Sequence, residues 1–81
     1  MFFWNTFENY TVPKKARILY ESGVFLTDIR YYEYKVNLYM LHNELVEVFY
    51  HHKKDIIEKI ERMDRNPTRL KFYADKIRID I

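Results

Sequence analysis

The residues of this chain that could bind a metal or transfer a proton near neutral pH are its three histidines. They are His42, His51 and His52, and the chain contains no Cys that could join them in a zinc site. His51 and His52 are adjacent, so on a strand their side chains point to opposite faces and cannot ligate one metal ion. His42 falls in an expected turn. We interpret all three as solvent-facing structural residues and expect no metal site.

Glu47 is the second candidate for chemistry, because it lies among apolar residues and near Tyr39 and Phe49. A carboxylate held in an apolar cleft could act as a general acid or base. The alternative is an exposed face on which Glu47 pairs with a cross-strand partner such as Lys35, and we favour this alternative. No second carboxylate is placed by the sequence to form an acid and base pair with it.

Nucleophiles and phosphate-binding loops find little support in the sequence. Gly23 is the only glycine, which excludes a glycine-rich phosphate loop. Ser22 is the only serine, and it lacks the sequence context of a nucleophile elbow. We therefore expect no enzyme activity and no cofactor.

Basic and aromatic side chains are mixed after the first expected strand, as they are on surfaces that bind single-stranded nucleic acids. Asp28 and Glu33 interrupt this cluster, and the net charge of the chain is only +2, so an ordinary structural role for the tyrosines is favoured. Nucleic-acid binding is kept as the alternative function. Its surface would consist of Arg30, Tyr31, Tyr32, Lys53, Lys54, Arg65 and Arg69.

The length and composition predict one globular domain over residues 1 to 81. Hydrophobic residues make up 48% and aromatic residues 19% of the chain, which is too much core-forming material for a disordered protein. The absence of Cys fits a reducing, cytoplasmic setting. The first residues lack the features of a signal peptide, and no apolar run approaches the roughly 18 residues of a membrane span, so we expect no membrane partner.

The stretch from Tyr34 to Tyr50 predicts the β-hairpin around which these side chains are arranged. Apolar residues recur with a period of two in both halves, at Val36, Leu38 and Met40 and again at Val46, Val48 and Tyr50. If both rows share one face, Met40 lies opposite Val46, which requires a three-residue loop of His42, Asn43 and Glu44. A two-residue turn at residues 43 and 44 would place the two rows on opposite faces, which the pattern disfavours.

A helix is predicted from about Val12 to Ser22. Thr11 offers an N-cap side chain, Pro13 suits the first turn, and Gly23 follows the helix at a position where positive φ is most useful. Before this helix, aromatic residues at helical spacing predict a further turn or two, at Phe3, Phe7 and Tyr10. After it, residues 24 to 29 are rich in β-branched and aromatic side chains and predict the first strand.

The segment from Ile56 to Met63 fits two structures. As a helix, it has Asp55 as the N-cap and Glu58 as the capping-box partner. As a strand, it extends the meander and covers an edge of the hairpin, although its alternation is poor. Beyond it, Pro67 to Ala74 predicts a short helix, and Lys76 to Ile81 alternates as an edge strand or a docked arm would.

The order of motifs along the chain resembles a set of short bacterial proteins of unknown function. The motifs are GVFLTDIR, VNLYML, LVEVFY, IIEKIERM and RLKFYADKIRIDI, and the likeness spans about residues 16 to 81. The shared pattern is a helix, then four strands, then a C-terminal Leu-x-x-Tyr segment. The resemblance implies that Ile56 to Met63 is a fourth strand, against its local helical propensity. It brings no activity and implies no site.

We predict an α+β domain in which the N-terminal helix packs on an antiparallel β-meander of about four strands, from about Val24 to Met63. A short C-terminal helix or arm follows. The runner-up is a three-stranded sheet in which residues 56 to 63 are helical. The residues expected to be most buried are Ile18, Leu19, Val36, Leu38, Met40, Val46 and Val48.

The leading functional prediction is a small non-catalytic interaction or structural module that meets a protein partner through its sheet, most simply another copy of itself. Both faces of the hairpin carry apolar side chains, whereas one short helix can cover only one face. The predicted interaction surface is Tyr39, Leu41, Leu45, Glu47 and Phe49. The competing prediction is a self-sufficient monomer, in which the N-terminal aromatic residues and the segment around Phe72 cover the second face.

Overall fold

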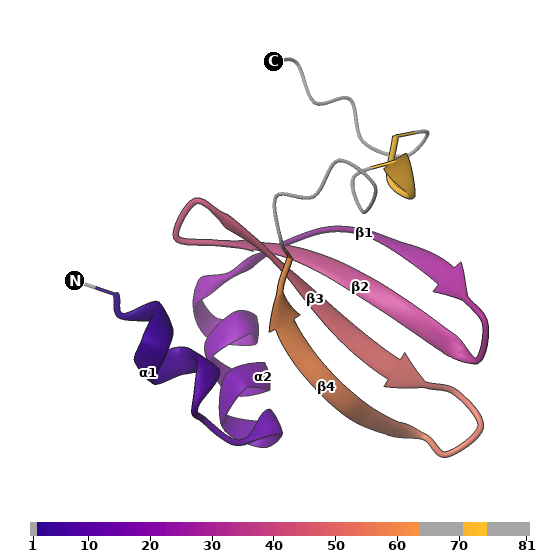
Figure 1. Cartoon of the computed structure of the whole chain (residues 1–81), viewed down its shortest axis with the longest axis horizontal. Helices are drawn as coiled ribbons and strands as arrows, with labels where there is room; N and C mark the ends of the chain where they lie inside the picture. The colour runs from indigo at the N-terminus through magenta and orange to yellow at the C-terminus, as the bar shows by residue number, and fades with distance from the viewer. Residues whose placement is uncertain (1, 64–70, 75–81) are drawn as a thin grey trace.

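Two helices precede a four-stranded antiparallel sheet in the computed structural model, which describes residues 2–63 and 71–74. The helices are α1 (Trp4–Glu8) and α2 (Val12–Ser22), and the strands are β1 (Val24–Tyr31), β2 (Tyr34–Leu41), β3 (Glu44–His51) and β4 (Ile56–Arg62). The strands form a meander in the order β1-β2-β3-β4 (Figure 1). The predicted α+β class is confirmed, and α2 has the predicted bounds. The predicted strand or arm at 76–81, and the first part of the predicted helix at 67–74, lie outside the described residues.

Helix α2 has the start signal expected from its sequence. The Thr11 side chain accepts a hydrogen bond from the Lys14 backbone N–H over 3.4 Å, and Pro13 occupies the first turn. The prediction of positive φ at Gly23 is wrong, because its φ of −89° and ψ of 166° are extended and open to any residue. A close approach explains the glycine instead. A Cβ atom at position 23 would lie 2.7 Å from the carbonyl oxygen of Leu19.

We expect Gly23→Ala to lower the free energy of unfolding by about 1 to 3 kcal/mol, as overpacking of a tight site does. The added Cβ must displace the start of β1 from the end of α2, where the Gly23 N–H donates to the Leu19 carbonyl over 2.8 Å. Urea denaturation measures the change. Ser22→Ala alters an exposed neighbouring position and serves as the control, so equal stability of the two variants would contradict the steric explanation.

The β2–β3 turn contains two residues and not the predicted three. His42 and Asn43 have φ values of 45° and 63°, as the two central residues of a type I′ turn do. Met40 consequently lies opposite Leu45. The predicted pairing of Met40 with Val46 is wrong, and the two apolar rows of the hairpin lie on opposite faces of the sheet. This register is favourable here because both faces are covered.

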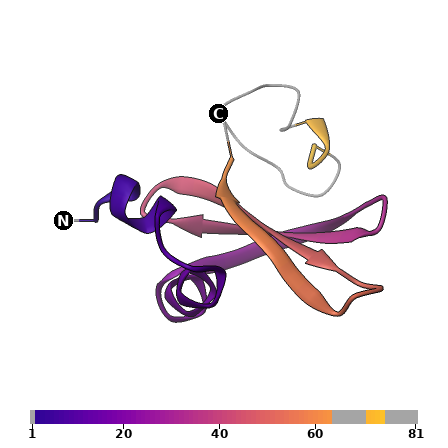
Figure 2. The ribbon, with the colours of Figure 1, turned by 60° about the horizontal axis from the view of Figure 1, so that its bottom comes forward.

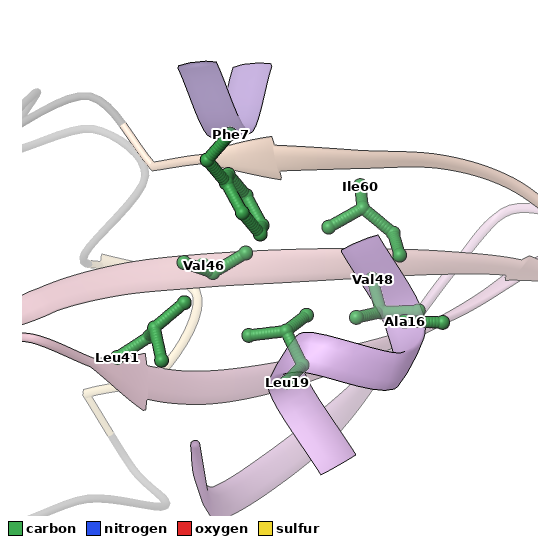
Figure 3. Close-up of a cluster of buried hydrophobic side chains, with 7 residues drawn as sticks. All are labelled: Phe7, Ala16, Leu19, Leu41, Val46, Val48 and Ile60. Atoms are coloured by element: carbon green, nitrogen blue, oxygen red, sulfur yellow. The ribbon is translucent and has the colours of Figure 1, made fainter. Parts of the chain in front are cut away.

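Helices α1 and α2 cover one face of the sheet, which we call the helix face. Phe7 of α1 and Leu19 of α2 are buried against side chains of β2, β3 and β4 (Figure 3). The ion pair between Glu8 and Arg62, at 3.2 Å, fixes α1 beside β4. The cluster consists of Phe7, Ala16, Leu19, Leu41, Val46, Val48 and Ile60.

The opposite face of the sheet carries a second apolar cluster. The segment 71–74 lies across the sheet from α2 (Figure 2), and its Tyr73 is buried in this cluster. The members are Ile29, Val36, Leu38, Phe49, Met63 and Tyr73. Most of the residues predicted to be buried are therefore confirmed, in one cluster or the other, and the exceptions are Ile18 and Met40, which are half-buried.

The segment with two predicted structures is strand β4, so the four-stranded sheet is confirmed and the three-stranded alternative is wrong. Ile60 lies opposite Val48 and is buried in the cluster of the helix face. The Lys15 ammonium of α2 also donates to the Ile60 carbonyl over 3.2 Å. Packing on α2 and pairing with β3 therefore override the helical signals of the local sequence.

Candidate interaction surface

The five residues predicted to form an interaction surface do not share one face of the sheet. Tyr39 and Leu41 belong to the helix face, whereas Leu45, Glu47 and Phe49 belong to the opposite face. The exposed fractions of Leu41, Glu47 and Phe49 are 1%, 4% and 7%, so these residues lie in the interior. The two-residue turn explains the division, because a shift of one residue moves a whole row to the other face.

Glu47 is a buried carboxylate and not an exposed partner of Lys35. Lys35 lies opposite Tyr50 on the helix face, whereas Glu47 lies opposite Leu38. The Tyr73 hydroxyl donates to Glu47 Oε2 over 2.7 Å. A carboxylate in the interior requires such partners, because a buried charge without them is strongly destabilising. Alternation along β3 could not reveal this contact, since Tyr73 lies 26 residues further along the chain.

The sheet brings part of the predicted nucleic-acid surface together. Arg30, Tyr31 and Tyr32 end β1 and enter its turn, and Lys53 and Lys54 occupy the β3–β4 turn. These two turns lie at the same end of the meander, which projects beyond the helices (Figures 1 and 2). Each of the two lysines already forms an ion pair, which reduces the positive charge available to phosphate groups. Arg65 and Arg69 lie outside the described residues.

His51 joins the two turns and is buried, so its predicted solvent-facing role is wrong. Its Nδ1 accepts from the Lys54 backbone N–H over 3.1 Å, which places the proton of the neutral ring on Nε2. Nε2 then donates to the Glu33 carboxylate over 3.0 Å. His42 and His52 are exposed, and within 2–63 and 71–74 no three His, Cys, Asp or Glu residues form a group that could hold a metal ion.

Two carboxylates at this end are stabilised in the charged form. Hydrogen bonds from Lys53, over 3.1 Å, and from His51 hold the pKa of Glu33 below its ordinary value of 4.5. Hydrogen bonds from Tyr34, over 2.5 Å, and from Lys54, over 3.2 Å, do the same for the pKa of Glu58. Both contributions to stability are present above the ordinary pKa and are lost as the pH falls through the lowered values. At neutral pH the charged Glu33 carboxylate therefore connects the β1–β2 turn to His51 and to Lys53 of the β3–β4 turn.

Two phenols at this end, Tyr34 and Tyr50, have raised pKa values, which predicts an effect at alkaline pH. The bond to Glu58 raises the pKa of Tyr34 above its ordinary value of 10.0, and the bond to Asp55 raises that of Tyr50. A raised phenol pKa contributes stability below the ordinary value, and this contribution is lost as the pH rises through the folded-state pKa. We expect Glu58→Gln to shift one late phenolate absorbance step to lower pH. Glu61→Gln, a change on the same strand, is the control and should leave every step in place.

A groove of about 570 Å³ separates α2 from the β3–β4 hairpin. Its lining is mostly apolar and consists of Val12, Pro13, Ala16, Tyr20, Tyr50, Asp55, Ile56 and Ile57. Asp55 is the only charged residue in this lining, and its carboxylate accepts a hydrogen bond from the Tyr50 hydroxyl. The lining offers no nucleophile with an adjacent base, so we assign no reaction to the groove.

The exposed apolar side chains of the sheet gather at the start of β1. Val24, Phe25 and Leu26 are 60%, 50% and 37% exposed, and Tyr20 of α2 lies beside them through its contact with Tyr39. In the described part of the chain, β1 pairs with β2 alone and is an edge strand. A long edge strand with exposed apolar residues favours pairing with another strand. The sequence did not reveal this surface, because Val24, Phe25 and Leu26 also fit a buried strand.

The other edge of the sheet, strand β4, has the features of a protected edge. Its last five residues alternate in charge around the buried Ile60, with Glu58, Lys59, Glu61 and Arg62. Charged side chains on an edge oppose strand pairing. Helix α1 also packs beside this strand, through the Glu8–Arg62 ion pair and the stacking of Arg62 over the Trp4 ring at 5.1 Å. Within residues 2–63 and 71–74 the two edges therefore differ: β4 is charged and lies beside α1, whereas β1 carries three consecutive exposed apolar residues.

Comparisons with known protein families, with curated proteins and with solved structures give no match for this chain. The resemblance to short bacterial proteins therefore stays a prediction. Neither helix of the described part of the chain has the length and apolar character needed to span a membrane.

Proposed function

We propose that this chain is a small non-catalytic interaction module that associates with a second copy of itself through the edge of β1. The observation that supports the proposal is the exposure of three consecutive apolar residues, Val24, Phe25 and Leu26, on an edge strand. The proposed interaction surface is therefore an edge of the sheet and not the face that the sequence pattern predicted. The reason is that α1, α2 and Tyr73 occupy the two faces.

A second copy is the simplest partner for this edge. Antiparallel pairing of a strand with its own copy obeys two-fold symmetry, which is the commonest symmetry of soluble oligomers. The pairing covers the apolar area of Val24, Phe25 and Leu26 that each copy exposes alone. A domain of 81 residues also buries a smaller share of its surface on folding than a larger domain does, so association adds a useful fraction to its stability. The contact is short, and we expect micromolar or weaker affinity.

Phe25→Lys is expected to abolish self-association and leave the protein folded. Phe25 is half exposed and touches Tyr39 ring to edge at 5.5 Å, so its loss should cost the fold only about 1 kcal/mol. A lysine at this edge opposes pairing by charge and by lost apolar contact. Light scattering across a dilution series measures association, and circular dichroism reports the fold.

Ile56→Lys is the matched control for this variant. Ile56 is 48% exposed and lies on β4, the opposite edge, so a lysine again replaces an apolar side chain at a similar exposure. This control should associate as the unaltered chain does. Association lost in Ile56→Lys and kept in Phe25→Lys would move the interface to β4. A chain that stays monomeric at every concentration would overturn the proposal.

Nucleic-acid binding is the second candidate, supported by the meeting of Tyr31 and Tyr32 with Lys53 and Lys54 at one end of the sheet. The ion pairs of Lys53 and Lys54 with Glu33 and Glu58 weigh against it. Retention on heparin that falls steeply with salt would favour this candidate over self-association.

A further inference from the structure

We infer that His51 is a pH-sensitive switch, which holds the β3–β4 turn closed while its ring is neutral and releases the Lys54 backbone N–H when the ring is protonated. The switch lies at the far end of the sheet from residues 24–26 and does not depend on the proposed self-association. Of the three histidines, His51 is the buried one, with a side chain that is 6% exposed. Histidine is also the side chain that ordinarily takes up a proton between about pH 5 and 8.

Both nitrogen atoms of the His51 ring have partners, but only the neutral ring can serve both. Nε2 donates to the Glu33 carboxylate over 3.0 Å, whereas Nδ1 accepts from the Lys54 backbone N–H over 3.1 Å. An imidazolium has two donors and no acceptor. Protonation therefore strengthens the bond to Glu33, because both partners are then charged, and turns the contact with Lys54 into one between two donors.

Two carboxylates provide the counter-charge that favours a protonated His51. Glu33 of the β1–β2 turn already bonds to Nε2, and Glu58 of β4 is close enough for its charge to interact with a charged ring. The pKa values of both carboxyls are held below the ordinary value of 4.5, so both stay anionic while histidine titrates. A charged ring therefore keeps its bond to Glu33 and loses the one to Lys54.

The cationic and aromatic neighbours of His51 do not replace the lost bond. Lys53 and Lys54 oppose a positive charge on the ring, and their ammonium groups are already paired with carboxylates, over 3.1 and 3.2 Å. An ammonium group is a donor, so neither lysine side chain can accept a proton from Nδ1. The Tyr34 and His52 rings lie 5.3 and 6.4 Å from the His51 ring, between centroids.

The bond that protonation removes is one of three that hold residues 51–55 in place. The Asp55 N–H donates to the His51 carbonyl over 2.8 Å, and Asp55 has a φ of 56°, in the sparsely populated left-handed region. The His52 N–H donates to the Glu33 carbonyl over 3.2 Å and joins this turn to the β1–β2 turn. Loss of the Lys54 bond therefore loosens the β3–β4 turn, while Glu33 still holds the ring.

Amide hydrogen exchange, followed by NMR at a protein concentration too low for association, tests the switch on the unaltered chain. After correction for the intrinsic effect of pH on exchange, protection of the Lys54 amide should fall about tenfold between about pH 7.5 and about pH 5, as loss of one hydrogen bond predicts. The fall should have the same midpoint as the change in the nitrogen shifts of the His51 ring. The Val48 amide, in the central strand β3, should keep its protection.

Three results of this measurement would overturn the inference. The first is a Lys54 amide that keeps its protection while the His51 ring titrates, and the second is a ring that stays neutral over the whole range. The third is an equal loss of protection at Val48, which would show that the fold as a whole opens and not the turn. Whether the chain associates at higher concentration has no bearing on any of them.

Two variants separate the charge of the ring from its surroundings. His51→Gln cannot take up a proton, so protection of the Lys54 amide should no longer depend on pH, whereas His52→Gln changes an exposed neighbour and should keep the dependence. Glu33→Gln removes a counter-charge and should move the midpoint of the Lys54 change to lower pH. An unchanged midpoint in Glu33→Gln, or a pH dependence that persists in His51→Gln, would contradict the assignment of the switch to His51.

Discussion

Phe49→Lys is expected to unfold the protein and not merely to dissociate it. Phe49 is buried in the second cluster together with Val36 and Met63, and truncating a buried Phe costs about 3 to 5 kcal/mol. The new ammonium adds a desolvation cost, and it would approach Lys59, whose own ammonium lies 4.5 Å from the Phe49 ring. The sum approaches the whole stability of a chain of this length, about 4 to 12 kcal/mol.

Phe25→Lys is the matched comparison, since it makes the same chemical change on the exposed edge. Far-ultraviolet circular dichroism should show an unfolded Phe49→Lys and a folded Phe25→Lys. A Phe49→Lys variant that stays folded and becomes monomeric would place Phe49 at the interface, as the alternation of the sequence predicted. That result would contradict the observed register of β2 with β3, on which both buried clusters depend.

The sequence predicted the helices and strands of this fold better than it predicted which face of the sheet each side chain lies on. Capping at Thr11, the alternation of the hairpin and the resemblance at residues 56 to 63 led to the observed helix and four strands. The register failed at one point, because His42 takes positive φ together with Asn43. Histidine is not a residue typical of type I′ turns. The prediction also assumed that only one face of the hairpin is buried, which disfavoured a two-residue turn. The turn is one residue shorter than predicted, and this difference divides the predicted interaction surface between the two faces of the sheet.

The candidate surface was harder to predict, for a physical reason. An edge and a central strand have the same alternation, so the exposure of Phe25 depends on strand order and not on local sequence. The contacts of Glu33 with His51 and Lys53 likewise join two turns that are about 20 residues apart. A meander brings alternate turns to one end of the sheet, and this rule could have anticipated that meeting. The burial of Glu47 depends on Tyr73 and had no local signal.

Leu19→Ala should remove much of the stability of the fold, by about 2 to 5 kcal/mol. Leu19 is 0% exposed and projects from α2 into the cluster of the helix face, among Leu41, Val46 and Val48 (Figure 3). Alanine is the better helix former, so the loss cannot come from helix propensity and must come from packing and the cavity left behind. The variant keeps the Thr11 cap of α2 and the packing of Ala16 against the sheet.

Urea denaturation of Leu19→Ala, at a protein concentration too low for association, measures this loss without a contribution from the dimer. Leu19→Met keeps the volume of the side chain and should cost less than about 1.5 kcal/mol. Glu21→Ala lies on the exposed side of α2 and should stay within about 0.5 kcal/mol of the unaltered chain. If Leu19→Ala lost no more than Leu19→Met, α2 would contribute little to the core, and the sheet would have to derive its stability from the opposite face and from pairing along β1.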